Sequence, residues 1–242
     1  MLLLATLAHA LADAPEGAGP DLADPAVREA TQLDVLDALL DAGMAEQALE
    51  MVSEMRKAGS FGVRLDVAQA RAMHMRGLAT DATELLLGVV KKHPREASAW
   101  SQLGVVYADG GKLDEAETAL RRAAKLAPGN ADIQNNLGFV LLSARENEAA
   151  IDAFRAALKI DPASRRTRNN LGFALVRLDR YDEALEAFRA ANAEPDARYN
   201  FGVACESAGD RAGAITSYQA AVSAQPGHPQ AAAALTRLLQ EY

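Results

Sequence analysis

Aromatic residues are scarce in this 242-residue chain, since Phe, Trp and Tyr together make up 5% of it. The hydrophobic half of the composition is carried mainly by alanine and leucine, which favour helices and argue against an all-β fold. A single cysteine, Cys205, excludes an internal disulfide, and the four histidines lie too far apart in sequence to form a local metal-ligand motif. We therefore expect neither a metal site nor a cofactor.

Positive charge is also in short supply, with 25 Lys and Arg against 33 Asp and Glu and a net charge of −8. Such a balance repels a phosphate backbone, so we expect no nucleic-acid partner. The acidic excess is concentrated in residues 1–55, which contain eleven Asp and Glu residues and one arginine. We interpret this excess as a solvated surface that aids solubility rather than as a device that steers a partner.

No apolar run is long enough to cross a bilayer, which takes about 20 residues. The longest candidate is MLLLATLAHALA at residues 1–12, followed by an acidic stretch rich in Pro and Gly. Small-x-small patterns at its end are typical of a secretory signal, although no basic residue precedes it. The alternative for the N-terminal segment 1–28 is an amphipathic starter helix plus an acidic linker. The first interpretation predicts a periplasmic protein and the second a cytoplasmic one, and both stay open.

Small residues recur in this chain with a period of 34 residues. Ala48, Ala82, Ala116, Ala150 and Ala184 are each 34 positions apart, and Ala214 follows after 30. Four positions after each of these alanines lies a larger apolar residue, namely Val52, Leu86, Leu120, Phe154, Phe188 and Tyr218. This spacing places small and large side chains on one helix face, where the small residue allows another helix to approach closely.

A second column marks a partner helix in each repeat. Leu103-Gly104, Leu137-Gly138, Leu171-Gly172 and Phe201-Gly202 recur in the same phase. Glycine within a helix costs about 1 kcal/mol relative to alanine, so its repetition in register indicates close helix packing. Prolines 94, 128, 162 and 226 end the repeats. We therefore predict a chain of antiparallel helical hairpins.

The pattern Trp100-x-x-Leu103-Gly104-x-x-Tyr107, followed by Ala116, Leu120, Ala123 and Pro128, resembles the tetratricopeptide repeat (TPR) consensus. This resemblance implies an all-α, right-handed superhelical α-solenoid of about six repeats, at residues 29–62, 63–96, 97–130, 131–164, 165–194 and 195–228, with a capping helix at 229–242. The repeats leave no room for a catalytic domain, and no catalytic motif is present. We therefore do not expect an enzyme.

The same resemblance implies that the first helices line a concave groove. Amides at Gln102, Asn136, Asn170 and Asn200 then form a row that matches the donors and acceptors of an extended peptide, with Asn135, Asn169 and Tyr199 beside it. Phe139 and Phe173 are candidates for an apolar anchor pocket in that groove. The alternatives are amides that hydrogen-bond within the scaffold and phenylalanines that pack between neighbouring helices.

Arginines gather at positions 165, 166, 168, 177 and 180. Arg166 and Arg177 in particular are candidates for contact with a partner that carries carboxylates, although arginines on a helix can equally be solvated or paired within the chain. The clamp that chaperone-binding family members use requires lysines where this chain has Ser101, Val105, Asn135 and Phe139. A chaperone's acidic tail is therefore disfavoured as the partner.

We predict a non-catalytic scaffold that binds an extended peptide segment or a partner helix. The number and length of its repeats resemble those of small bacterial proteins that assist pilus assembly, which implies a role in building a pilus or secretion complex. Two other functions stay open: a cytoplasmic docking module that regulates an enzyme or transcription factor, and an enzyme accessory that binds a small acidic ligand. The sequence does not predict the oligomeric state.

Overall fold

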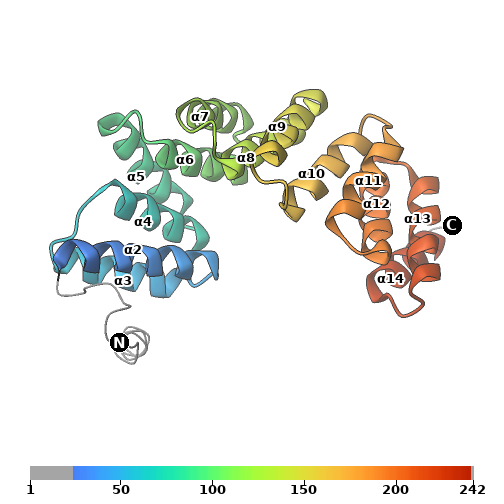
Figure 1. Ribbon diagram of the computed structural model, residues 1–242, viewed down its shortest axis with the longest axis horizontal. Helices are drawn as coiled ribbons and strands as arrows, with labels where there is room; N and C mark the ends of the chain where they lie inside the picture. The colour runs from blue at the N-terminus through green and yellow to red at the C-terminus, as the bar shows by residue number, and fades with distance from the viewer. Residues whose placement is uncertain (1–23, 241–242) are drawn as a thin grey trace. The chain divides into compact units, whose positions relative to one another are not determined.

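The computed structural model describes residues 24–240, which form thirteen α-helices and no strand (Figure 1). The chain divides into two compact units, Met1–Leu85 and Leu86–Tyr242. Within the described residues, no helix combines the length and the apolar character needed to cross a membrane. The predicted signal or starter segment at residues 1–12 lies outside the described residues.

The first unit contains α2 (Pro25–Asp41), α3 (Ala45–Lys57) and α4 (Val63–Met75), and α5 (Ala79–Lys92) spans the boundary between the units. α2 begins four residues before the predicted start of the first repeat, because the Asp24 carboxylate accepts from the Ala26 N–H at 2.8 Å and Pro25 occupies the first helical position. The buried face of this unit is formed by apolar residues of all three helices, including Leu36, Val52 and Leu65.

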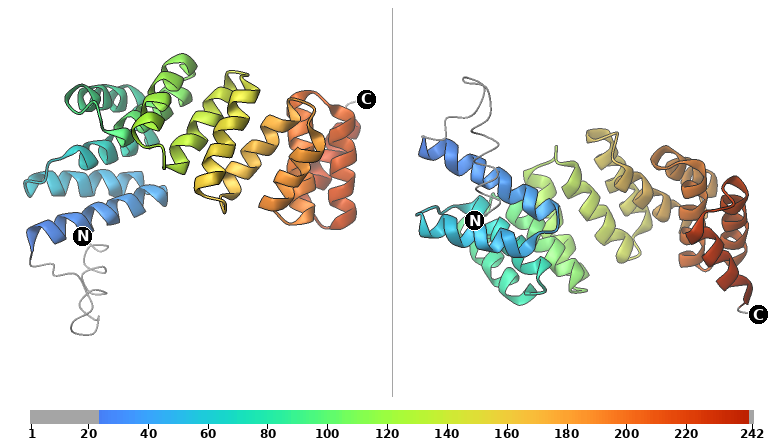
Figure 2. Two further views of the ribbon diagram at one scale, coloured as in Figure 1. Left: turned by 45° about the horizontal axis from the view of Figure 1, so that its top comes forward. Right: turned by 90° about the horizontal axis from the view of Figure 1, so that it is seen from below.

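The second unit consists of four helical hairpins and a final helix, which are seen from two further directions in Figure 2. The hairpins are α6 (Ala97–Asp109) with α7 (Leu113–Leu126), α8 (Ala131–Ser143) with α9 (Asn147–Ile160), α10 (Arg165–Val176) with α11 (Tyr181–Ala191), and α12 (Glu194–Ala208) with α13 (Arg211–Ala224), followed by α14 (Pro229–Gln240). Each helix contacts the next one along the chain, and one apolar core runs through these contacts. This arrangement confirms the predicted all-α fold of helical hairpins.

The repeated glycine lies against the large residue of the second helix in its own hairpin. A Cβ atom added at Gly104 would lie 2.5 Å from Leu120 Cγ, and one at Gly138 would lie 2.6 Å from the Phe154 ring. The same holds for Gly172 with Phe188 and for Gly202 with Tyr218. Since real Cβ atoms do not approach other heavy atoms so closely, these glycines are required by packing, as the sequence predicted.

The turn between the two helices of each hairpin contains one residue in the left-handed region. This residue recurs in register, and glycine fills the position at Gly43, Gly77, Gly111 and Gly209. Arg145 (φ 66°) and Asp179 (φ 58°) occupy the equivalent positions in the α8–α9 and α10–α11 turns. These two turns therefore carry backbone strain that glycine would relieve.

We expect the substitution Arg145→Gly to stabilise the protein by about 0.5 to 1 kcal/mol. It removes about 1 to 2 kcal/mol of left-handed strain, and the greater freedom of glycine in the unfolded chain offsets about half of that gain. Urea unfolding followed by circular dichroism measures the change. The reverse substitution at the equivalent turn, Gly111→Arg, should destabilise the protein, and equal signs for the two variants would contradict this account.

Candidate functional site

The second unit contains a groove of about 340 Å³ between the first helices of three successive hairpins, α6, α8 and α10. One part of its lining is apolar and the other is polar. The apolar residues are Val105, Ala108, Leu120, Phe139 and Val140, and the polar ones are Asp109, Asn135, Asn136, Arg166 and Asn170. Five of the residues predicted as a binding surface therefore come together here, namely Asn135, Asn136, Phe139, Arg166 and Asn170.

Phe139 is the large apolar residue that the groove presents to solvent. Its side chain is 49% exposed, although it follows directly on the buried Gly138 of α8. Each Å² of apolar surface removed from water contributes about 25 cal/mol, so a partner that covers this ring gains binding free energy. The ring therefore offers an anchor point for an apolar side chain.

The Arg166 guanidinium contacts the amides of Asn136 and Asn135, and the Asn135 amide contacts that of Asn170; we call these four residues the amide–arginine cluster (Asn135, Asn136, Asn170 and Arg166). Arg166 Nη2 donates to Asn136 Oδ1 at 2.6 Å. The Asn135 amide, oriented to satisfy its neighbours, accepts from Arg166 Nη2 at 2.5 Å and from Nε at 3.0 Å. In that orientation the Asn135 amide also donates to Thr167 Oγ1 at 3.2 Å and lies 3.0 Å from the Asn170 amide. The cluster links α8 to α10 and supplies donors and acceptors at the rim of the apolar lining.

The other predicted site residues do not line this groove. Phe173 packs against the core, with its ring edge-to-face on Phe188 at 5.5 Å. Tyr199 lies against the rings of Tyr218 (5.8 Å) and His228 (5.4 Å). Asn169 Oδ1 accepts from Asn192 Nδ2 at 2.7 Å, which is a bond within the scaffold. The half-buried Gln102 and Asn200 also lie outside the groove lining.

The groove ends at α10 because the next first helix lies closer. α11 ends at Ala191 and α12 begins at Glu194, and the repeated glycines Gly172 and Gly202 are 30 residues apart rather than 34. α10 and α12 contact each other more extensively than α8 and α10 do. Phe173 of α10 and Phe201 of α12 both reach the Phe188 ring, with centroids at 5.5 Å and 6.4 Å. Side chains therefore fill the space between α10 and α12, whereas the equivalent space between α8 and α10 forms part of the groove.

The predicted arginine patch is divided between scaffold contacts and the groove. Arg165 donates to Ala191 O at 2.6 Å and Arg168 to Ala190 O at 3.1 Å, so both satisfy carbonyls at the end of α11. Arg180 is bonded to Glu183, and Arg177 donates to Leu142 O at 2.5 Å. Arg166 is thus the member of the patch that lines the groove.

Four lining residues were not predicted as part of the site: Ala108, Asp109, Leu120 and Val140. Leu120 is one of the large apolar residues that pack on the repeated glycine, so the sequence predicts it to be a core residue. The periodic pattern gives no signal for Ala108 and Asp109, because they lie near the end of α6, where the helix meets its turn. Val105 belongs to the same column as Phe139, and the sequence does point to it.

The thiol of Cys205 is buried and protonated, whereas a nucleophilic cysteine is accessible and ionised. Burial raises the pKa of Cys205 to about 11, with the charge of Asp210 adding to the effect, so the thiol stays protonated at neutral pH. Among residues 24–240, no group of His, Cys, Asp and Glu side chains could hold a metal ion. The described chemistry is that of a binding surface with amides, one guanidinium and an exposed ring.

Comparison with known proteins identifies the fold of this chain. No curated protein matches this sequence. The structure is similar to YrrB, described as "a TPR protein with an unusual peptide-binding site" (22% identity, TM-score 0.57, covering 75% of this chain and 95% of YrrB). It is also similar to two MamA structures, one at 23% identity and TM-score 0.54, covering 64% of this chain and 92% of that one. The other, MamA MSR-1, has 25% identity and a TM-score of 0.52, covering 69% of this chain and 95% of that one.

The family model for the tetratricopeptide repeat matches residues 76–131, 102–165, 135–197 and 169–229. These overlapping matches span residues 76–229, which is more than half of the chain, and they include every helix that lines the groove. The repeated glycine contacts and the solved neighbours agree with this assignment, as does the predicted solenoid of about six repeats with a C-terminal capping helix. The chain belongs to the tetratricopeptide repeat family.

Proposed function

We propose that this protein is a non-catalytic scaffold whose groove between α6, α8 and α10 binds an extended segment or a helix of a partner protein. The observation that carries the proposal is the exposed Phe139 ring beside the amide–arginine cluster. An apolar anchor next to several amides suits a peptide, because the ring takes a side chain while the amides pair with main-chain N–H and C=O groups. YrrB's description as a peptide-binding TPR protein is consistent with this use.

We further propose that the partner belongs to a complex that this chain helps to assemble, of the pilus or secretion class. The support for this class is the number and length of the repeats. Partner and scaffold would meet through Asn136, Phe139, Arg166 and Asn170, with Asn135 positioning the arginine. Gln102 of α6 would extend the contact if the bound segment is long enough to reach it.

The experiment is photo-crosslinking from position 139 in the native cell. Phe139 is replaced by p-benzoylphenylalanine, which keeps an aromatic ring in place, and crosslinked proteins are identified by mass spectrometry. We expect one dominant product from a pilus or secretion complex, and about tenfold less of it when Asn136→Ala and Asn170→Ala are added. Two lost hydrogen bonds of about 0.5 to 1.5 kcal/mol each account for that factor.

The matched control is Gln219→Ala, which removes an exposed amide from α13, outside the groove. It should leave the yield of the crosslinked product unchanged. A product that persists in the double-amide variant would exclude the cluster from binding. A metabolic enzyme or a transcription factor as the product would replace the assembly role with regulatory docking.

A further inference from the structure

Two arginines occupy equivalent positions in different units of the chain. Arg64 at the start of α4 and Arg166 at the start of α10 are separated by 102 residues, which is three periods of 34. The residues of the preceding first helix that face them are equivalent as well: Asp34 and Asp37 of α2 correspond to Asn136 and Phe139 of α8. The chain therefore contains two versions of one local arrangement.

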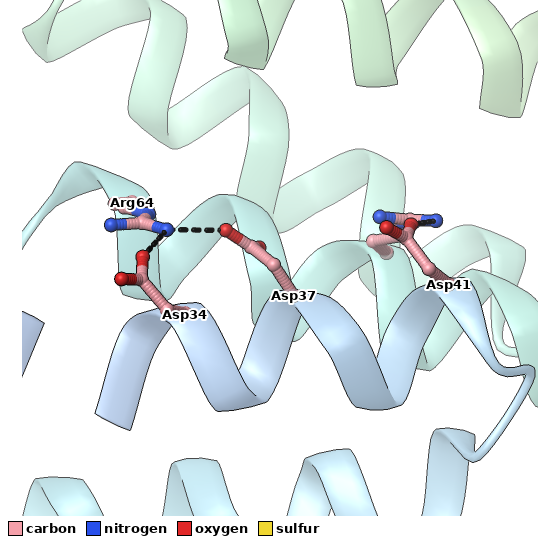
Figure 3. A network of polar contacts seen from close by, with 5 residues as sticks. Asp34, Asp37, Asp41 and Arg64 are labelled. Atoms are coloured by element: carbon pink, nitrogen blue, oxygen red, sulfur yellow. Dashed lines mark hydrogen bonds and ion pairs between the residues drawn. The ribbon is translucent and has the colours of Figure 1, made fainter. Parts of the chain in front are cut away.

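In the first unit, carboxylates of the chain itself neutralise the arginine (Figure 3). Arg64 Nη2 donates to Asp34 Oδ1 at 2.7 Å and to Asp37 Oδ2 at 2.5 Å. The hydrogen bonds to Asp37 and Asp34 raise the pKa of Arg64. One turn further along α2, Asp41 is paired in the same way with Arg71 at 2.7 Å. The charges of this helix face are thus satisfied internally.

In the second unit, neither of the two equivalent positions has a carboxylate. Arg166 meets the neutral amides of Asn136 and Asn135, and no Asp or Glu within residues 24–240 forms an ion pair with it. Where the first unit has Asp37, the second has the Phe139 ring, which is 49% exposed. Arg166 therefore has amide rather than carboxylate partners beside an exposed apolar surface, in a groove whose one lining carboxylate is Asp109 of α6.

We propose that the groove recognises an Asp or Glu side chain of the partner that lies within one helical turn of an apolar side chain. The carboxylate takes the place on Arg166 that Asp34 has on Arg64, and displaces the Asn136 amide from it. The apolar side chain covers Phe139. This inference rests on the proposed peptide-binding function and adds the chemistry of the ligand.

Charge strength favours this exchange. A hydrogen bond between guanidinium and carboxylate is about twice as strong as one between neutral groups, and the planar guanidinium can bind both carboxylate oxygens. The amide that is displaced keeps other partners, because its donors and acceptors can turn to the ligand's main chain. The internal pairs in the first unit show that a carboxylate fits beside the arginine at the equivalent position of this chain.

The probe is a random dodecamer peptide library selected on the full-length chain, with the affinities of selected peptides measured by fluorescence anisotropy. We expect the peptides to share an Asp or Glu within four positions of a large apolar residue. Changing that acid to its amide should weaken binding at least about tenfold, whereas amidating the peptide's C-terminus should leave affinity unchanged.

The decisive protein variant is Asn136→Asp, which rebuilds the internal ion pair of the first unit in the second. It should reduce peptide affinity at least about tenfold, while the unfolding midpoint stays the same or rises. The matched control, Arg64→Gln, removes the equivalent arginine from the first unit and should leave affinity unchanged.

The outcomes separate the two proposals. Peptides that bind equally well with acid or amide, that depend on a free C-terminus, or that tolerate Asn136→Asp would overturn the acidic recognition and leave the peptide-binding groove standing. If the library yields no peptide whose binding is sensitive to Phe139→Ala or to Asn170→Ala, the proposed function fails together with this inference.

Discussion

The substitution Phe154→Ala should lower the free energy of unfolding of the second unit by about 3 to 5 kcal/mol. The Phe154 side chain on α9 is fully buried and fills the contact with Gly138 of α8. Its removal costs the transfer free energy of the ring and leaves a cavity between two helices that cannot fully collapse. Urea unfolding followed by circular dichroism measures the effect as a lower midpoint of the main transition.

A second phenylalanine provides the control. Phe61, in the connection between α3 and α4, is 71% exposed, and the Arg56 guanidinium lies 6.0 Å from its ring centre. The substitution Phe61→Ala should therefore cost less than about 1 kcal/mol. Similar losses for the two variants would contradict the assignment of Phe154 to the core of the hairpin stack.

The substitution Gly138→Ala should destabilise the protein by about 2 kcal/mol, although alanine is the better helix former. The new Cβ would lie 2.6, 2.7 and 3.0 Å from three atoms of the buried Phe154 ring, and overpacking of this kind costs about 3 kcal/mol. The gain in helix propensity of about 1 kcal/mol offsets only part of that cost. Thermal and urea unfolding of the purified variant measure the difference.

Gly88 tests the gain in helix propensity without the overpacking. It lies in α5, is exposed, and has no heavy atom within 4 Å of the place where a Cβ would be added. Gly88→Ala should therefore stabilise the protein by about 1 kcal/mol. In a Phe154→Ala background, Gly138→Ala should also become stabilising, because the ring that it meets is gone. A destabilising Gly138→Ala in that background would show that the glycine is needed for another reason.

The fold could be predicted from the sequence because its determinants repeat. Gly138 and Phe154 are 16 residues apart, and the same pair recurs at Gly172 with Phe188, so one contact rule appears several times in a single chain. Each recurrence adds to the signal of a 3.6-residue period, and all of them indicate the same two-helix unit. The structure confirms the predicted contacts of the repeated glycines directly.

The candidate site could be predicted only in part, because equivalent sequence positions meet different neighbours. Phe139 and Phe173 both follow the repeated glycine, yet one ring is exposed and the other packs on Phe188. The difference arises from how closely the next first helix approaches, which depends on the length of the repeat and not on the residues around each phenylalanine. The hydrogen-bond partners of Arg165 and Arg168 could not be predicted from the sequence either. Both arginines donate to main-chain carbonyls, which every residue has.

The short connection between α11 and α12 has a consequence for how proteins of this kind diversify. The repeat that contains α10 and α11 is four residues shorter than the 34-residue period, which brings α12 against α10, and the tract open to a ligand stops there without any change to the residues that line it. Insertions and deletions in the second helix of a hairpin and in its connection to the next hairpin can thus lengthen or shorten the stretch of partner that the scaffold contacts. The length of the bound segment and the chemistry that the groove recognises are in this way encoded by separate parts of the gene. Each can evolve while the other is conserved.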